Sequence, residues 1–179
     1  MHGAVLEELR ALQARRVLDV GCGTGILTAQ MGSDIGGLVC GCDLSRGMLE
    51  QATHRRAGPW VQADAASLPV RSGSVDAVVS TEAFHWFADH DVALREFHRA
   101  LVPGGRMLVA FVNPSSQGPA RAARAWSSMA GQSAYWPTRR EMRARVEAAG
   151  FRVCTQRRVI RIFGVAFPTV LTVAERLER

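Results

Sequence analysis

The sequence predicts an α/β domain in which a mostly parallel sheet carries helices on both faces. Short apolar runs typical of buried strands alternate along the chain with segments of helical periodicity. Glycine, proline or acidic residues stand at most of the boundaries between these segments. Such alternation builds crossover units and therefore a parallel sheet. With 179 residues, of which 47% are hydrophobic, we expect residues 1–179 to form a single domain around one core.

The first half of the chain contains four of the predicted strands, which follow its apolar runs. These runs cover residues 17–20, 38–43, 60–64 and 75–80. Helices are predicted over residues 7–16 and 25–31, and from a cap at Ser45. Helices thus separate the first three strands, as parallel pairing requires.

The second half of the chain predicts two helices and three further strands. Apolar residues recur at helical spacing over 91–101, and the turn Pro103-Gly104-Gly105 ends this helix. Thr138 caps the second helix. The strands follow the apolar or alternating segments 107–112, 151–160 and 168–174. The predicted sheet therefore has seven strands.

Three glycines stand where the first strand meets the helix that follows it. Gly21, Gly23 and Gly25 provide positions without side chains, which a ligand close to the backbone requires. Asp43 ends the second strand about 20 residues later, where one carboxylate can accept hydrogen bonds from both hydroxyls of a ribose. The pattern predicts a cofactor that contains adenosine.

The spacing of these glycines differs from that of the dinucleotide fingerprint. The fingerprint is G-x-G-x-x-G, whereas this chain has G-x-G-x-G and carries Ile26 at the third dinucleotide position. The difference disfavours a nicotinamide cofactor.

Residues 17–25, Val-Leu-Asp-Val-Gly-Cys-Gly-Thr-Gly, resemble motif I of class I S-adenosylmethionine-dependent methyltransferases. Later segments agree with that family in order, namely Asp43, Ala63-Asp64-Ala65, 74–80 and 101–106. The resemblance is close over residues 17–112 and extends to the helix and Ala-Ala-Gly-Phe ending at 141–151. It implies a Rossmann-like, mostly parallel seven-stranded sheet with an antiparallel C-terminal strand. It also implies S-adenosylmethionine as cofactor and S-adenosylhomocysteine as product.

The resemblance assigns cofactor binding to residues at or after the strand ends. Asp19 is expected to orient the glycine loop, and Asp43 to hold the ribose. Leu44 and Met48 are expected to pack on the adenine, with ordinary core packing as the alternative. Asp64 is expected to recognise the adenine amino group, with a turn or helix cap as the alternative. The complete set is Asp19, Gly21, Gly23, Gly25, Asp43, Leu44, Met48, Asp64, Ala65 and Ser80.

Methyl transfer from a sulfonium requires no covalent nucleophile, but a hydroxyl or amine acceptor must lose a proton. His85 is the first candidate for the base and Glu82 the second, because both follow the fourth strand at the carboxyl edge of the sheet. His85 has two alternative roles: a structural residue beside Trp86, or a ligand of the cofactor's methionine end.

Aromatic and acidic residues surround these candidates. The aromatic side chains within 84–87 form either a wall that excludes water or part of the core. Residues 89–91, Asp-His-Asp, have the composition of a metal triad but stand where the next helix requires acidic caps. We therefore expect no metal.

The chain is most similar to small-molecule methyltransferases of the quinone-biosynthesis and carrier-protein-ester type, which have a segment like 84–87 after the fourth strand. Their substrates vary, so the acceptor atom stays open between O, N and C. Residues 114–137 are expected to form a variable segment on the substrate side, or a surface helix and loop. The family usually has a longer helical segment before Val17 than this chain. An open site, a covering second subunit in a homodimer, or a shortened N-terminus would each explain this.

Composition limits the partners. All 22 basic residues are Arg, and residues 114–179 contain twelve of them against four Glu. This excess suits a solvated helix face or contact with an anionic surface, whereas the absence of zinc-finger, RNP and GxxG motifs argues against nucleic acid. No apolar stretch reaches the roughly 18 residues of a membrane span and no signal peptide opens the chain, so we expect a cytoplasmic protein.

The sequence therefore favours a methyltransferase that acts on a small molecule with S-adenosylmethionine. Two other classes remain as alternatives. One is a noncatalytic module that binds S-adenosylmethionine, and the other is an NAD(P)-dependent oxidoreductase, which Ile26 disfavours.

Overall fold

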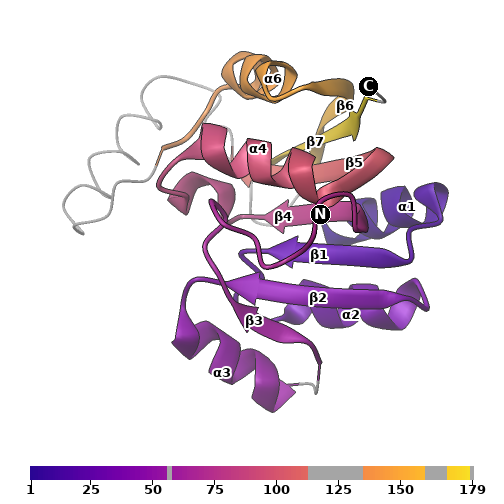
Figure 1. The fold of residues 1–179 in the computed structure, drawn as a ribbon, viewed down its shortest axis with the longest axis vertical. Helices are drawn as coiled ribbons and strands as arrows, with labels where there is room; N and C mark the ends of the chain where they lie inside the picture. Colours follow the sequence, from indigo (N-terminus) through magenta and orange to yellow (C-terminus); the bar gives the residue numbers. More distant parts are fainter. Residues whose placement is uncertain (56–57, 113–134, 160–168, 178–179) are drawn as a thin grey trace.

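A seven-stranded sheet runs through the molecule (Figure 1). The computed structural model describes residues 1–55, 58–112, 135–159 and 169–177. The strands are β1 Arg16–Val20, β2 Leu38–Asp43, β3 Trp60–Gln62, β4 Val75–Thr81, β5 Leu101–Val112, β6 Phe151–Val159 and β7 Thr169–Arg176. Their order is β3-β2-β1-β4-β5-β7-β6, with β7 antiparallel to both neighbours and all other pairs parallel. The predicted fold class is confirmed, including the antiparallel C-terminal strand.

Helices cover both faces of this sheet. They are α1 His2–Leu12, α2 Ile26–Asp34, α3 Arg46–Arg55, the single-turn η1 Phe84–Trp86, α4 His90–Ala100 and α6 Arg139–Ala148. α1 and α2 belong to one buried cluster, α4 and α6 belong to the other, and α3 packs beside β2 and β3. Successive residues of β1 and β4 point to opposite faces of the sheet and so belong to different clusters. Leu18 and Val78 belong to one cluster, and Val17 and Val79 belong to the other. Burial on both faces is typical of parallel sheets.

The first helix lies earlier in the chain than the predicted 7–16, because residues 13–16 lead into β1. Gln13 adopts a left-handed conformation with φ 55°, and the amide of Ala14 donates to the carbonyl of Leu9. The amides of Arg15 and Arg16 then donate to the carboxylate of Asp76 on β4, at 2.9 and 2.8 Å. This long-range carboxylate fixes the entry into β1, and a helical pattern does not reveal it.

The third strand ends at Gln62 instead of Asp64. The carboxylate of Asp64 accepts a hydrogen bond from the amide of Ala66 at 2.9 Å, and its carbonyl accepts one from Ser67 at 3.0 Å. These bonds close a turn, which is incompatible with continued pairing.

The Pro103-Gly104-Gly105 segment does not end the helix before β5, as the sequence suggested. α4 ends at Ala100 and β5 begins at the next residue, so this segment lies inside the strand. The pairing with β4 shifts register there, and Gly104 has φ 73°. The glycines thus accommodate an irregularity within β5.

The predicted helix caps are present. The Asp89 carboxylate accepts from the amides of Asp91 and Val92, and Thr138 forms a reciprocal capping box with Glu141. The hydroxyl of Ser45 accepts from the amide of Met48 at 3.4 Å. Among the helices described, none is long and apolar enough to cross a membrane.

Candidate active site

A cavity of about 1000 Å³ lies where the carboxyl ends of β1, β2 and β4 meet the segment after β3. Ligands of open parallel sheets bind at this edge, where the strand order reverses. Nine of the predicted site residues line it: Asp19, Gly21, Gly23, Asp43, Leu44, Met48, Asp64, Ala65 and Glu82. Three do not line it: Gly25, Ser80 and His85.

The glycine loop folds tightly against β2. The amides of Gly21 and Cys22 both donate to the carbonyl of Cys42, at 2.8 and 3.0 Å. Gly21 has φ 72°, and a Cβ placed on it would lie 2.2 Å from the Cβ of Ala83. Gly21 is therefore required by the close approach of the segment after β4.

Gly23 is different, because the space beside it is open. Its φ is 54°, and a Cβ placed there would have no atom within 4 Å. Its amide donates to Oδ2 of Asp43 at 2.8 Å. Packing within the protein does not explain this glycine, whereas a ligand in the cavity would. Gly25, the residue before α2, instead packs under the ring of Trp60.

Asp43 is fixed by two backbone amides. Oδ2 accepts from Gly23 and Oδ1 from Ser45, each at 2.8 Å. A carboxylate offers about four acceptor positions, so two remain for a ligand's hydroxyl groups. The geometry suits the ribose contact that the sequence suggested.

Asp19 is buried at the base of the loop. Its Oδ2 accepts from the hydroxyl of Thr28 on α2 at 2.6 Å, which joins the strand end to the helix. Burial raises the pKa of Asp19 to about 7, and the charge of Asp43 acts in the same direction, while the bond from Thr28 opposes the shift. A cation in the cavity would favour the ionised form of Asp19.

The far end of the cavity presents exposed apolar side chains. Leu44 is 65% exposed and Met48 is 42% exposed, so neither belongs to the core. Asp64 forms the turn that was its alternative role, yet it also lines the cavity. These residues leave an apolar surface beside a carboxylate, as an adenine requires.

Glu82 follows β4 and lines the cavity. It has φ 58°, a conformation that is rare outside glycine, and its amide donates to the carbonyl of Ala110 at 2.9 Å. Strained residues of this kind cluster at functional sites. Ser80, two residues earlier, is buried, and its hydroxyl has no partner among the described residues.

His85 lies behind the cavity instead of in it. Its ring stacks on Trp136 with centroids 3.9 Å apart and lies 4.7 Å from the ring of Trp86. Burial, assisted by the charge of His90, lowers the pKa of His85 to about 4, so the imidazole is neutral near pH 7. Trp86 and Phe87 line the cavity, whereas Phe84 is buried in the core.

The sequence did not identify several residues that line the cavity. His2 reaches it because α1 docks on the sheet. Its Nδ1 forms a hydrogen bond with Oε1 of Gln30 at 2.8 Å. Thr24, Ile26 and Ala88 also line it. Thr24 lies within the glycine loop and Ile26 directly follows it, so their positions in the sequence could have indicated them, whereas only tertiary structure places His2.

The Asp-His-Asp segment at 89–91 does not form a metal centre in the described structure. Asp89 caps α4, the Nε2 of His90 is 2.8 Å from the carbonyl of Phe84, and Asp91 pairs with Arg145 at 2.6 Å. No group of three or more potential metal ligands occurs among the described residues.

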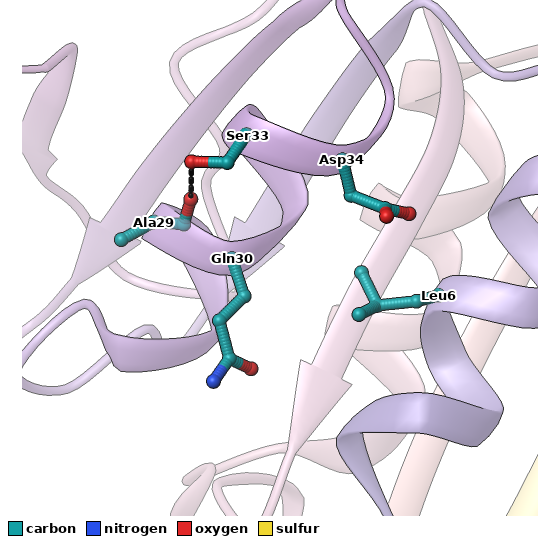
Figure 2. A pocket seen from close by; sticks show the side chains of 5 residues that line it. All are labelled: Leu6, Ala29, Gln30, Ser33 and Asp34. Atoms are coloured by element: carbon teal, nitrogen blue, oxygen red, sulfur yellow. Dashed lines mark hydrogen bonds between the residues drawn. The ribbon is translucent and has the colours of Figure 1, made fainter.

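A second hollow, of about 460 Å³, lies between α1 and α2 (Figure 2). Leu6 comes from α1, and Ala29, Gln30, Ser33 and Asp34 come from α2. The hydroxyl of Ser33 donates to the carbonyl of Ala29 at 3.1 Å, and Asp34 is paired with Arg10. These polar groups serve the helices themselves, so the cavity at the strand ends is the stronger candidate.

Comparison with known proteins identifies the family of the chain. The model of a methyltransferase domain family matches residues 18–109. A demethylmenaquinone methyltransferase of Mycolicibacterium gilvum is 32% identical over 168 residues, covering 83% of this chain and 73% of the relative. A malonyl-[acyl-carrier protein] O-methyltransferase of Hahella chejuensis is 41% identical over 96 residues, covering 51% of this chain and 34% of the relative.

The fold is also shared with solved structures. An S-adenosylmethionine-dependent methyltransferase of Mesorhizobium loti has a TM-score of 0.78 at 21% identity, covering 98% of this chain and 100% of that one. Against several curated relatives the chain covers only 21% to 45% of the relative's length. The chain belongs to the methyltransferase domain family, for which S-adenosylmethionine is the expected cofactor.

Proposed function

We propose that the protein transfers a methyl group from S-adenosylmethionine to a small-molecule acceptor. The observation that carries the proposal is the pairing of Gly23 with Asp43. Gly23 leaves open space on the cavity side, and its amide holds a carboxylate that retains free acceptor positions. Together they suit a ligand with a ribose that lies against the backbone.

The rest of the cavity fits this cofactor. Leu44 and Met48 offer an apolar surface for the adenine, with Asp64 beside them. When bound, S-adenosylmethionine supplies a methyl group on a positively charged sulfur. Asp19, Asp43 and Glu82 place carboxyl groups along the cavity that complement a cation.

Glu82 is the better placed of the two candidate bases. It lines the cavity after β4, whereas His85 is buried behind Trp86. We therefore assign to Glu82 the role of the base that removes the proton of the methyl acceptor. We assign to His85 the positioning of the aromatic residues. The low pKa of His85 favours a neutral ring that stacks on Trp136.

The proposal includes a small-molecule acceptor and a cytoplasmic location. The relatives compared above act, by their names, on demethylmenaquinone and on a malonyl carrier-protein ester. Cys22, Cys40, Cys42 and Cys154 are all free thiols, which is the usual state in a reducing compartment.

Calorimetry with S-adenosylhomocysteine tests the cofactor. We expect Asp43→Ala to weaken binding roughly tenfold to a hundredfold, because hydrogen bonds to a charged acceptor are worth about 1.5 to 3 kcal/mol. Glu50→Ala removes an exposed carboxylate of α3 that does not line the cavity, and it should bind like the wild type.

Two results would contradict the proposal. Binding of NAD in place of S-adenosylhomocysteine would indicate an oxidoreductase. Binding of the cofactor without methylation of any acceptor in a broad small-molecule panel would indicate a noncatalytic binding module.

A further inference from the structure

We propose that Trp60 is a positioning residue for the cofactor: its indole ring supports the glycine loop, residues 21–25, from outside the cavity. Trp60 does not line the cavity itself. The inference rests on the proposed function and adds a residue on which cofactor affinity depends without contact to the cofactor. It depends on three observations: where the ring lies, which part of the loop it touches and what the loop holds on its other side.

The first observation is the place of the ring on the sheet. Trp60 is the first residue of β3, the strand at one edge of the sheet (Figure 1), and its side chain is partly buried. In the pairing of β2 with β3 it stands opposite Gly41. A Cβ placed on Gly41 would lie 2.5 Å from Cζ3 and 2.7 Å from Cε3 of Trp60. Glycine inside a strand often marks the close approach of another group, and here that group is the indole ring.

The second observation is that the same ring reaches the end of the glycine loop. A Cβ placed on Gly25 would lie 2.6 Å from Cη2 of Trp60 and 3.0 Å from the Cβ of Ala52 on α3. Gly25 is the residue before α2, and its amide donates to the carbonyl of Cys22 at 3.0 Å. The ring therefore fills the space between β2, α3 and the last residue of the loop.

The third observation is that the supported loop carries the proposed cofactor contact. The amide of Gly23 donates to Oδ2 of Asp43 at 2.8 Å, and only Thr24 separates Gly23 from Gly25. The three glycines of the loop have positive φ angles, and a glycine backbone is easily deformed. Close packing against a rigid ring restricts this freedom. A void in place of the ring would let the loop shift and misplace the amide that holds Asp43.

Calorimetry with S-adenosylhomocysteine on three variants measures this support. Trp60→Ala should raise the dissociation constant about tenfold or more, whereas Trp60→Phe keeps an aromatic ring and should stay within about threefold of the wild type. Met142→Ala is the matched control, because it truncates a fully buried side chain of α6 that does not line the cavity. It should lower the urea midpoint as Trp60→Ala does, yet leave the cofactor affinity unchanged where all variants are folded.

Gly41→Ala tests the contact between ring and strand. Its new methyl group would overlap the ring of Trp60 at 2.5 Å, so it should weaken S-adenosylhomocysteine binding about tenfold. In the Trp60→Ala background the same change should alter affinity by less than about twofold, because the ring is gone. The remaining contact, 3.0 Å to Sγ of Cys22, requires only a small shift. Such coupling is not expected if each substitution acts only by lowering stability.

Several outcomes would overturn the inference. Wild-type affinity in folded Trp60→Ala would show that the ring is not needed, and equal weakening in Met142→Ala would show that any loss of stability suffices. If Trp60→Ala does not fold, Trp60→Leu replaces it with an expected loss of about fivefold, and unchanged affinity there would reject the support equally. Absence of S-adenosylhomocysteine binding to the wild type would instead reject the proposed function.

Discussion

At the β1–β3 end of the cavity, backbone hydrogen bonds hold the polar groups, whereas at the β4 end ring contacts hold Trp86 and Phe87. Asp43 is fixed by amides two and twenty residues away. Trp86, in contrast, rests against His85, whose ring stacks on Trp136 from beyond β5. The first end is built largely from one continuous segment, and the second requires segments that are distant in the chain.

This difference indicates what each end recognises. Backbone amides and a fixed carboxylate define directions, which suits a cofactor with hydroxyl groups. Ring faces define a plane but few directions, which suits acceptors that vary in their polar groups. We therefore expect changes at the first end to alter cofactor binding, and changes at the second to alter turnover and acceptor choice.

The two glycines of the loop provide the largest expected contrast. Gly23→Ala should lower the affinity for S-adenosylhomocysteine about a hundredfold, because the new methyl group would enter the cavity, while stability falls by about 1 to 2 kcal/mol from the positive φ. Gly21→Ala should lose more stability, about 2 to 4 kcal/mol, because it also overlaps Ala83. Urea unfolding and calorimetry measure the two effects. Wild-type cofactor affinity in Gly23→Ala would show that the open space is not used.

Replacing Glu82 tests whether the β4 end of the cavity serves turnover instead of cofactor binding. Glu82→Gln should lower kcat about a hundredfold if the carboxylate accepts the acceptor's proton, with little change in cofactor affinity. Steady-state kinetics and calorimetry on the same preparation check this. An unchanged kcat with weakened cofactor binding would move Glu82 to the cofactor end.

The buried carboxyl of Asp19 should make stability depend on pH. Its pKa is raised to about 7, mainly by burial, whereas the unfolded chain ionises near 3.9. The native state therefore binds more protons between these values, so stability falls as pH rises from about 4 to about 7. We expect a loss on the order of 4 kcal/mol that is absent in Asp19→Asn.

Urea titrations of both proteins across this range measure the difference. Adding S-adenosylmethionine should flatten the wild-type curve, because a cation favours the ionised carboxylate. Parallel curves for the two proteins would mean that Asp19 is ionised throughout.

The smallest expected effect concerns His85. His85→Phe keeps a flat ring against Trp136, so kcat should stay within about threefold of the wild type, whereas His85→Ala should lower it about tenfold. A loss of a hundredfold or more in His85→Phe would restore His85 as the base. Steady-state measurements of kcat for both variants distinguish a positioning role of His85 from a role as the base.

Local patterns predicted most of the fold and most of the residues that line the β1–β3 end of the cavity. The apolar run 38–43 matches β2 residue for residue, and Thr138 caps α6 as expected. The Pro-Gly-Gly segment misled the prediction, because glycine and proline signal an irregular backbone in a strand as well as at a helix end. Residues 114–134 of the predicted variable segment lie outside the described residues.

By itself the sequence determined the order of strands and helices along the chain and the positions of the glycine loop and Asp43. Hydrophobic periodicity and tight turns that bring a ligand close to the backbone are encoded by neighbouring residues. Only the tertiary structure decided that Glu82 lines the cavity, that His85 lies behind it and that His2 reaches it. Those positions depend on contacts between residues far apart in the chain. The direction of a side chain after a strand end follows from packing, and a residue pattern does not specify it.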